Sequence, residues 1–257
     1  MLNTIQYHSD GAATKLLIAH GLYGSGRNWG VIAKRLSDRG PVTAVDMRNH
    51  GLSPWFKTQS YPEMAQDLAG VIEAGTTGAA DVLGHSMGGK AAMVLALTRP
   101  ELVSRLIVAD IAPVGYEHSQ IQYIRAMRAV DLTQVEKRAD AEAQLAAHVA
   151  DKALLSFFTQ SLDIGQKRWR LNLDTLEGEM PKILGFPDVS GVFHGPALFL
   201  SGANSDYVTR EHRPRIKALF PKAQFARIPG AGHWLHAEKP REFEAAVRAW
   251  LDHARPL

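Results

Sequence analysis

The sequence predicts an α/β fold, in which a mostly parallel sheet is flanked by helices and interrupted by a helical insertion. Three observations support this prediction. Short apolar runs alternate with helical patterns along most of the chain. One apolar run leads through a glycine-rich turn directly into an alanine-rich helical pattern. A long stretch between two later runs contains no convincing strand.

Six apolar runs are expected to form the strands of one sheet, because each is short and bounded by turn-forming residues. They are Lys15–Ala19, Pro41–Asp46, Ala79–Gly84, Leu106–Asp110, Ala197–Ser201 and Gln224–Ile228. Helices are expected from Met87 to Thr98, directly after the third run, and from about Pro240 to His253 at the end of the chain. Strands that alternate with helices favour parallel pairing, since parallel strands need crossover connections.

The strand-free stretch has helical periodicity in four places, which are Ser119–Ala129, Gln134–His148, Lys152–Thr159 and Gln166–Leu176. The strand pattern resumes after it. We therefore expect one domain, in which residues 1–111 and 195–257 form the α/β core and residues 112–194 form a helical lid. Phe157, Phe158 and Trp169 are expected on lid helices, where aromatic side chains more often pack in a core than line an acyl pocket.

The composition is that of an ordinary globular protein, with 46% hydrophobic and 21% charged residues. The absence of cysteine excludes disulfides, thiolate catalysis and zinc sites built on cysteine. The net charge is only +3, and 26 acidic residues accompany 29 basic ones. The densest basic stretch, Arg210–Lys217, also contains Glu211 and Pro214. This mixture predicts a solvated helix face and no nucleic-acid partner.

The first residues have neither a basic start nor an apolar run, so no signal peptide is expected. The longest apolar runs, such as Ala91–Leu97, are far shorter than the roughly 20 residues that span a bilayer. These observations predict a cytoplasmic protein without a membrane span. The sequence leaves the oligomeric state open.

The strongest chemical signal is Gly84–Gly88, which fits the pattern Gly-x-Ser-x-Gly between a predicted strand and a predicted helix. In the α/β-hydrolase fold this context places a nucleophilic serine on a strained turn, and glycines are needed where larger side chains would clash. The pattern predicts Ser86 as the nucleophile. The start of the following helix presents backbone N–H groups to developing negative charge.

Two backbone N–H groups are predicted to form an oxyanion hole. The first belongs to Met87, the residue after the nucleophile, and the second to Leu22 in the His20–Leu22 loop at the end of the first strand. A plain glycine turn is the alternative interpretation of that loop.

His233 is the predicted general base, because it follows the last strand in a glycine-rich loop that can direct the ring toward Ser86. His236 is expected to face away. A metal site formed by these two histidines is a weak alternative, since no carboxylate nearby completes a zinc ligand set. No metal and no cofactor are expected.

Two aspartates satisfy the chain order of nucleophile, acid and base. Asp110 closes an apolar strand, where a carboxylate is costly to bury without a partner such as an imidazolium. Asp206 lies in the loop after Ala197–Ser201, one residue beyond the usual acid position, which Ser205 occupies. The residues alone leave both aspartates open as the acid.

Five segments together resemble the small bacterial esterases of the YbfF type and the related ABHD-type mitochondrial hydrolases. They are HGLYGSGRNW (His20–Trp29), DMRNHGLSP (Asp46–Pro54), GHSMGGKAAM (Gly84–Met93), DIAP (Asp110–Pro113) and GAGHW (Gly230–Trp234). They span nearly the whole chain in the same order. The segment beginning at Asp46 is expected to form a structural turn near the site.

The resemblance implies hydrolysis of acyl esters or thioesters without a cofactor. It also implies that Asp110 is the acid and that Ser205 supports it, with Asp206 as a departure from the family pattern. Alternatives on the same catalytic residues are a lactonase, a carbon–carbon bond hydrolase and a cofactor-free haloperoxidase. A ligand-binding protein without catalysis is the alternative from another class. Epoxide hydrolases and haloalkane dehalogenases are disfavoured, because their nucleophile is an aspartate.

Overall fold

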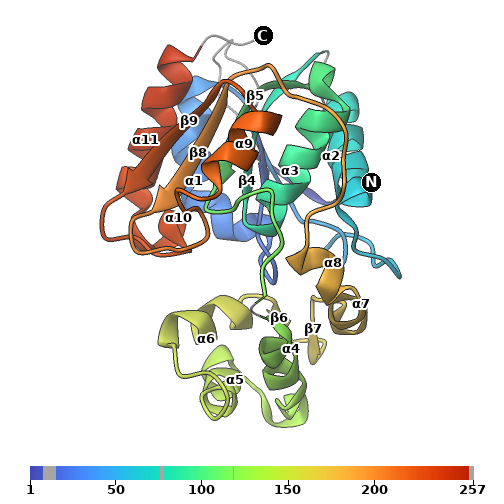
Figure 1. Cartoon of the computed structure of the whole chain (residues 1–257). Coiled ribbons are helices and arrows are strands. Elements are labelled where there is room, and N and C mark those ends of the chain that lie inside the picture. The colour runs from blue at the N-terminus through green and yellow to red at the C-terminus, as the bar shows by residue number, and fades with distance from the viewer. Residues whose placement is uncertain (8–15, 76–77, 118, 255–257) are drawn as a thin grey trace.

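The computed structural model of the chain describes residues 1–7, 16–75, 78–117 and 119–254. Its centre is a seven-stranded sheet with the order β1-β3-β2-β4-β5-β8-β9 (Figure 1). Only the edge strand β1 is antiparallel to its neighbour. The strands are β1 (Thr4–Tyr7), β2 (Leu16–Ala19), β3 (Val42–Val45), β4 (Ala80–His85), β5 (Val103–Ala109), β8 (Ala197–Gly202) and β9 (Ala223–Ile228). The predicted α/β class is confirmed.

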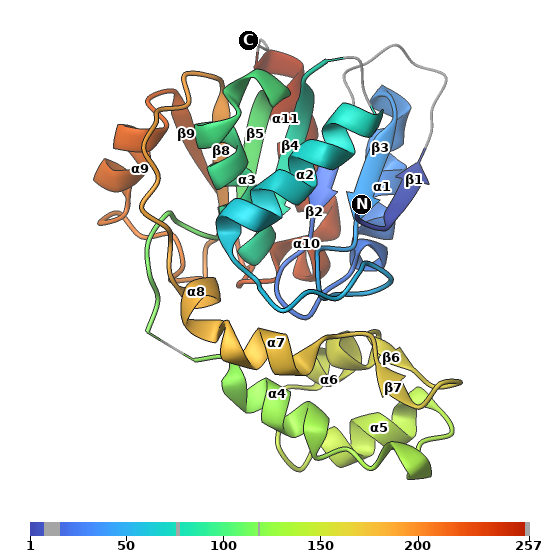
Figure 2. The same ribbon diagram turned by 90° about the vertical axis from the view of Figure 1, so that its right-hand side faces the viewer.

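Helices cover both faces of this sheet (Figures 1 and 2). Side chains of α2 (Tyr61–Gly75), α3 (Met87–Thr98) and α9 (Arg213–Leu219) share one hydrophobic cluster, and those of α1 (Gly30–Leu36) and α11 (Pro240–His253) share another. Every residue of α3 except Thr98 is buried, as expected for the helix that covers the middle of the sheet. In α11 only one stripe is buried, because its other face meets solvent.

The six predicted strands correspond to β2, β3, β4, β5, β8 and β9, and the predicted bounds of α3 and α11 are confirmed. Lys15, the first residue of one predicted strand, lies outside the described residues. Strand β1 was not predicted, because apolar and polar side chains alternate only weakly in its four residues. The weak pattern reflects its place at the sheet edge, where none of the four is fully buried. The predicted basic face is present in α9, where Arg213, Arg215 and Lys217 are exposed.

The segment between β5 and β8, called the insertion below (residues 112–194), lies beyond one edge of the sheet (Figure 2). It contains α4 (Ile121–Arg128), α5 (Arg138–Leu145), α6 (Lys152–Thr159), α7 (Leu173–Gly178), α8 (Met180–Leu184) and a two-stranded ribbon of β6 (Leu162–Asp163) and β7 (Arg168–Trp169). The helix predicted over Gln166–Leu176 is therefore wrong. Its first part pairs with β6 as a strand, and only its end is helical.

The insertion is tied to the core by polar contacts at several places. Lys90 of α3 is buried and donates from Nζ to the carbonyl oxygens of Leu184 (2.8 Å) and Gly185 (2.6 Å), which end α8. The Tyr61 hydroxyl donates to the Ile183 carbonyl in the same turn. These donors satisfy carbonyl groups that a helix end leaves unpaired. Burial lowers the pKa of Lys90 to about 7.

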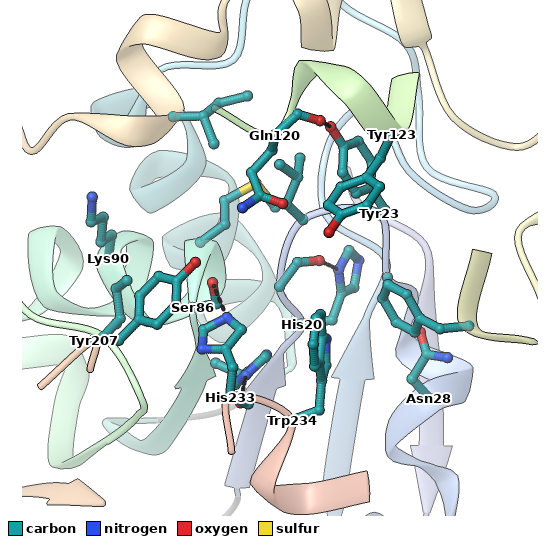
Figure 3. A pocket seen from close by; sticks show the side chains of 18 of the residues that line it. His20, Tyr23, Asn28, Ser86, Lys90, Gln120, Tyr123, Tyr207, His233 and Trp234 are labelled. Carbon is teal, nitrogen blue, oxygen red and sulfur yellow. Dashed lines mark hydrogen bonds between the residues drawn. The ribbon is translucent and has the colours of Figure 1, made fainter. Parts of the chain in front are cut away.

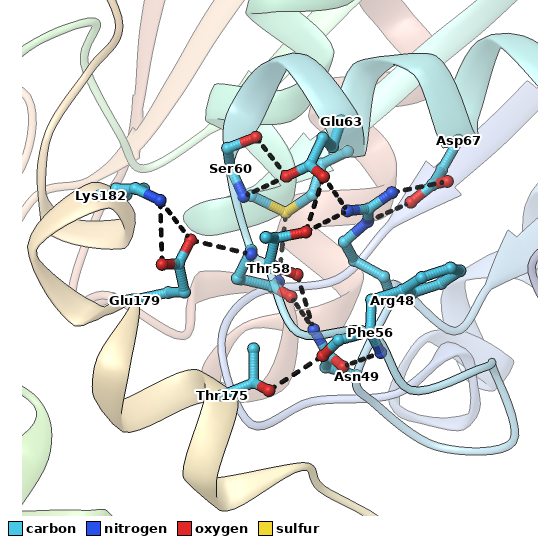
Figure 4. A network of polar contacts seen from close by, with 12 residues as sticks. Arg48, Asn49, Phe56, Thr58, Ser60, Glu63, Asp67, Thr175, Glu179 and Lys182 are labelled. Carbon is cyan, nitrogen blue, oxygen red and sulfur yellow. Dashed lines mark hydrogen bonds and ion pairs between the residues drawn. The ribbon is translucent and has the colours of Figure 1, made fainter.

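A second attachment joins the insertion to the chain after β3 (Figure 4). Phe56 accepts at its carbonyl oxygen from the Thr175 hydroxyl (2.9 Å), and Glu179 accepts from the Gln59 amide (3.2 Å). The bonds fix α7 and α8 against the core.

Among the helices that the structure describes, none is long and apolar enough to cross a membrane. Helix α10 (Leu235–Glu238) precedes α11.

Candidate active site

The predicted site residues lie where strands of the sheet end. Ser86 follows β4, Asp110 follows β5 and His233 lies in the loop after β9. The strands are parallel, so their carboxyl ends meet at one edge of the sheet, where open α/β folds place their sites. The sheet order thus brings together residues that are far apart in sequence.

Ser86 occupies a strained turn between β4 and α3, with φ of 52° and ψ of −119°. Non-glycine residues rarely adopt a positive φ. The flanking glycines permit this turn. A Cβ atom on Gly84 would lie 2.2 Å from the Gly88 carbonyl oxygen, and one on Gly88 would lie 2.4 Å from the Ala19 carbonyl oxygen. The start of α3 therefore packs directly against strand β2, which leaves no room for a larger side chain at either glycine.

A continuous chain of polar contacts joins the three predicted catalytic side chains, and Figure 3 shows its link between Ser86 and His233. His233 Nε2 lies 3.1 Å from Ser86 Oγ, and His233 Nδ1 lies 2.8 Å from Asp110 Oδ2. A carboxylate only accepts hydrogen bonds, so Nδ1 carries the proton and Nε2 is free to accept one from the serine. This is the arrangement that a general base for Ser86 requires.

Asp110 is fully buried and its carboxylate is held on several sides. Oδ1 accepts from the Gly202 amide at 3.0 Å, and Oδ2 accepts from the Ser205 hydroxyl as well as from His233. The neighbouring Asp206 is exposed to solvent. The geometry therefore favours Asp110 over Asp206 as the acid and places Ser205 beside it as a hydrogen-bond donor.

The amides of Leu22 and Met87 belong to two segments next to Ser86, a turn and the start of a helix. Met87 is the first residue of α3, and Leu22 lies in the turn after β2 that Gly24 closes by donating to the Gly21 carbonyl (3.1 Å). Within the part of the chain that the structure describes, no backbone carbonyl accepts from either amide. Both are thus available as donors for an oxyanion.

A cavity of about 240 Å³ opens above Ser86. Ser86 and His233 lie at its base, and Gln120 and Tyr123 of the insertion face them from the opposite side (Figure 3). The walls are mostly apolar and aromatic. Phe157 and Phe158 line the cavity, as one interpretation of the lid aromatics expected. Trp169 does not. It lies in β7, packs inside the insertion and donates to the Met127 carbonyl at 2.9 Å.

Sequence reasoning missed two residues that position His233, one through its ring and one through its backbone. Tyr207 stacks on the ring, with the ring centroids 4.0 Å apart. His85 donates from Nε2 to the His233 carbonyl at 2.9 Å, and burial holds the pKa of His85 well below its usual value, so it is neutral. His85 stands inside the serine motif, but the motif specifies only its glycines and its serine, so it does not indicate this role. No local pattern points to Tyr207, because its contact depends on the loop after β8.

His236 is buried and stacks on Trp29, with centroids 4.2 Å apart and the planes 7° from parallel. Its ring packs against the core, and its centroid lies 4.6 Å from the centroid of the His85 ring. Among the described residues, no group of three or more histidines, aspartates or glutamates is placed to hold a metal ion. The weak alternative of a metal site at His233 and His236 thus gains no support from the geometry.

Comparison with known proteins places the chain in a family. A sequence model of the α/β-hydrolase fold matches residues 15–240. The chain is 42% identical to the mouse sn-1-specific diacylglycerol lipase ABHD11, over 94% of this chain and 83% of that protein. It is 39% identical to esterase YbfF of Escherichia coli K12, over 92% of each chain.

Among solved structures, a marine microorganism esterase superimposes with a TM-score of 0.91 and is 38% identical. The match covers 96% of this chain and 98% of that one. The agreement extends over both the sheet and the insertion, because each chain is covered almost completely. The chain therefore belongs to the α/β-hydrolase family, in the group that contains esterase YbfF and ABHD11.

Proposed function

We propose that this protein hydrolyses small carboxylic esters or acyl thioesters, with Ser86 as the nucleophile. The observation that supports it most is the unbroken contact chain from Ser86 Oγ through His233 to Asp110, at the base of an apolar cavity. The names of the relatives agree with this chemistry, since they are an esterase and a diacylglycerol lipase. The cytoplasmic location stays a prediction.

In the first step Ser86 Oγ attacks the carbonyl carbon, and its proton passes to His233 Nε2. The carbonyl oxygen becomes negative and accepts from the Leu22 and Met87 amides. The bond to the leaving group then breaks, and His233 returns the proton to the departing alcohol or thiol. Asp110 holds the ring in the tautomer that allows both transfers and stabilises the imidazolium between them.

In the second step a water molecule attacks the acyl-enzyme, and His233 Nε2 takes its proton. The same two amides hold the second oxyanion. The intermediate collapses to release the carboxylic acid, and Ser86 recovers its proton from His233. Because every proton is shuttled by one imidazole, the reaction needs no group beyond the substrate, water and these side chains.

The test combines a substrate panel with active-site labelling. Aryl esters and acyl thioesters of graded chain length are assayed, and the protein is treated with a fluorophosphonate. We expect turnover of at least one series and covalent labelling at Ser86, identified by peptide mass spectrometry. Labelling without turnover of any ester or thioester would favour a lactonase, a carbon–carbon bond hydrolase or a haloperoxidase. The absence of both would favour a ligand-binding protein.

The insertion is expected to set the acyl-chain preference through Phe157. This side chain is half-buried in the cavity wall, so Phe157→Ala enlarges the cavity without removing a fully buried ring. We expect kcat/KM for longer chains to rise about tenfold relative to the acetyl ester, since each methylene in an apolar pocket is worth roughly 1–3 kcal/mol.

The matched control for this prediction is Trp169→Phe, which alters an aromatic residue of the insertion outside the cavity. It should leave the chain-length profile of kcat/KM unchanged, although it lowers stability. An unchanged profile in Phe157→Ala would show that the insertion does not line the acyl site.

A further inference from the structure

Two buried imidazoles lie beneath the loop that carries Leu22. His20 and His50 are almost completely inaccessible to solvent, and their rings meet edge to face with centroids 5.1 Å apart. His50 Nε2 lies 3.2 Å from the Tyr23 amide nitrogen, and His50 Nδ1 lies 2.8 Å from the Arg48 carbonyl oxygen. An amide can only donate and a carbonyl can only accept. These contacts therefore fix one tautomer, in which Nδ1 carries the proton and Nε2 accepts.

His20 makes the complementary pair of contacts. Its Nε2 accepts from the Met47 amide at 2.9 Å, and its Nδ1 donates to the Gly21 carbonyl at 2.7 Å. In the Gly21–Gly24 turn, each of the two peptide groups that flank Leu22 is thus held by one imidazole. His20 holds the carbonyl of Gly21, and His50 holds the amide of Tyr23. Leu22, whose amide is the proposed oxyanion donor, lies between these two points.

The held turn is not one that its residues adopt readily. Tyr23 has a φ of +64°, which non-glycine side chains rarely accept. Such a residue relaxes toward other conformations unless its surroundings hold it in place. The bond from the Tyr23 amide to His50 is the contact from the core that opposes this relaxation. Moving Tyr23 would displace the Leu22–Tyr23 peptide group. The Leu22 amide belongs to the preceding peptide group, and the displacement would reach it through the backbone of Leu22.

We propose that His50 is a positioning residue for the oxyanion hole. By accepting from the Tyr23 amide, His50 directs the Leu22 N–H toward the carbonyl oxygen of the substrate. The proposal rests on the proposed function, since it assigns a role to a residue that does not itself reach the substrate cavity. Oxyanion donors act only when they are fixed in advance at hydrogen-bond distance from the developing charge.

The charge state of His50 agrees with this role. Burial and, to a lesser extent, the neighbouring His20 lower the pKa of His50, while the bond to the Arg48 carbonyl and the Asp46 carboxylate act in the opposite direction; the resulting pKa is about 3. The imidazole is therefore neutral at the pH at which esterases are assayed, and its Nε2 remains an acceptor. A protonated ring would present an N–H to the Tyr23 amide and break the contact.

The segment that carries His50 is itself rigid. The Gly51 amide donates to the Arg170 carbonyl (2.8 Å), and the Asn172 amide donates to the Asn49 carbonyl (3.0 Å). The Asn49 side chain donates to the Thr58 carbonyl at 3.0 Å (Figure 4). His50 is thus supported by both the core and the insertion, which is what a residue that positions another group requires.

The experiment compares His50→Leu, which removes the acceptor, with His50→Gln, which keeps one on a side chain of similar length. For each variant kcat and KM are measured on a short aryl ester, together with the inhibition constant of a trifluoromethyl ketone. The Ser86 oxygen adds to that ketone, and the resulting oxyanion occupies the hole. Val247→Ala serves as the control, because Val247 is a buried side chain of α11 in a different hydrophobic cluster from Tyr23 and Leu22.

We expect His50→Leu to lower kcat about 100-fold, the scale seen on loss of one oxyanion donor, with KM nearly unchanged. The ketone should bind more weakly by a similar factor, and His50→Gln should recover most of both losses. Val247→Ala should lower the melting temperature while kcat and ketone binding hold. If His50→Leu does not fold, His50→Gln and His50→Asn carry the same comparison with graded reach of the acceptor.

Unchanged ketone binding in a folded His50→Leu variant would overturn the proposal, as would a loss of kcat no larger than that of Val247→Ala. Failure of the proposed function gives a different pattern, because then the wild-type protein neither hydrolyses esters nor binds the ketone. That result would also overturn the role assigned to His50.

Discussion

Ser86→Ala is expected to abolish ester hydrolysis while leaving the fold intact. The side chain removed is small, and the turn that carries it is held by Gly84, Gly88 and the packing of α3 on the sheet. Loss of the nucleophile removes the atom on which His233 and Asp110 act, so kcat should fall on the order of 10⁶-fold, as in a serine protease. The measurement is kcat on the best ester of the panel, with the fold checked by circular dichroism.

The control for this variant is Ser37→Ala at the end of α1, where the hydroxyl donates to the Lys34 carbonyl. It should retain wild-type kcat. Activity in Ser86→Ala above about a tenth of the wild-type value is far more than a nucleophile knockout retains, and would assign the chemistry to another residue. Fluorophosphonate labelling of the same variant gives an independent check, since no adduct should form.

Asp110→Asn is expected to cause the second largest loss, of about 100-fold or more in kcat, because an acid that orients the imidazole contributes up to about 10⁴ in the serine-protease example. An asparagine amide facing His233 Nδ1 would favour the wrong tautomer and leave Nε2 protonated. The Ser205 and Gly202 donors would remain around a neutral side chain. The KM for a short aryl ester should change much less than kcat.

Two companion variants separate the rival acids. Asp206→Asn should lose less than about tenfold in kcat, because this carboxylate is exposed and Asp110 already occupies His233 Nδ1. Ser205→Ala should lie between the two, since it removes one donor to the Asp110 carboxylate and the acceptor of the Tyr207 amide but leaves the carboxylate itself in place. A near-silent Asp110→Asn beside a crippled Asp206→Asn would return the acid to the loop after β8.

The parts of the fold that could be predicted are those fixed by local chemistry. Helix α3 begins where the glycines of the serine motif force a turn, and α11 shows one apolar stripe, so both were predicted with their observed bounds. The helix predicted over Gln166–Leu176 was wrong, because pairing of Arg168–Trp169 with β6 overrides the helical periodicity. Strand β1 was not predicted, because it has no apolar run of its own and is a strand through its pairing with β3.

The candidate site divides in the same way. The predicted catalytic positions follow from motifs at strand ends, but the choice between Asp110 and Asp206 depends on which loop lies beside His233, and both satisfy the chain order. The contributions of His50, Lys90 and Tyr207 could not be predicted from the sequence for a different reason. Each acts through a contact with a segment distant in sequence, on which a single chain without its fold gives no information.

Ser86 and Asp110 share a backbone feature, because both have a positive φ, of 52° and 53°. Conformations of this kind cost on the order of 1–3 kcal/mol each. Selection for heat tolerance and selection for turnover therefore act on these two positions in opposite directions, since glycine would relieve the strain and remove the chemistry. A variant library sorted by melting temperature alone would drift toward inactive survivors, so directed evolution of this scaffold needs an activity screen in every round.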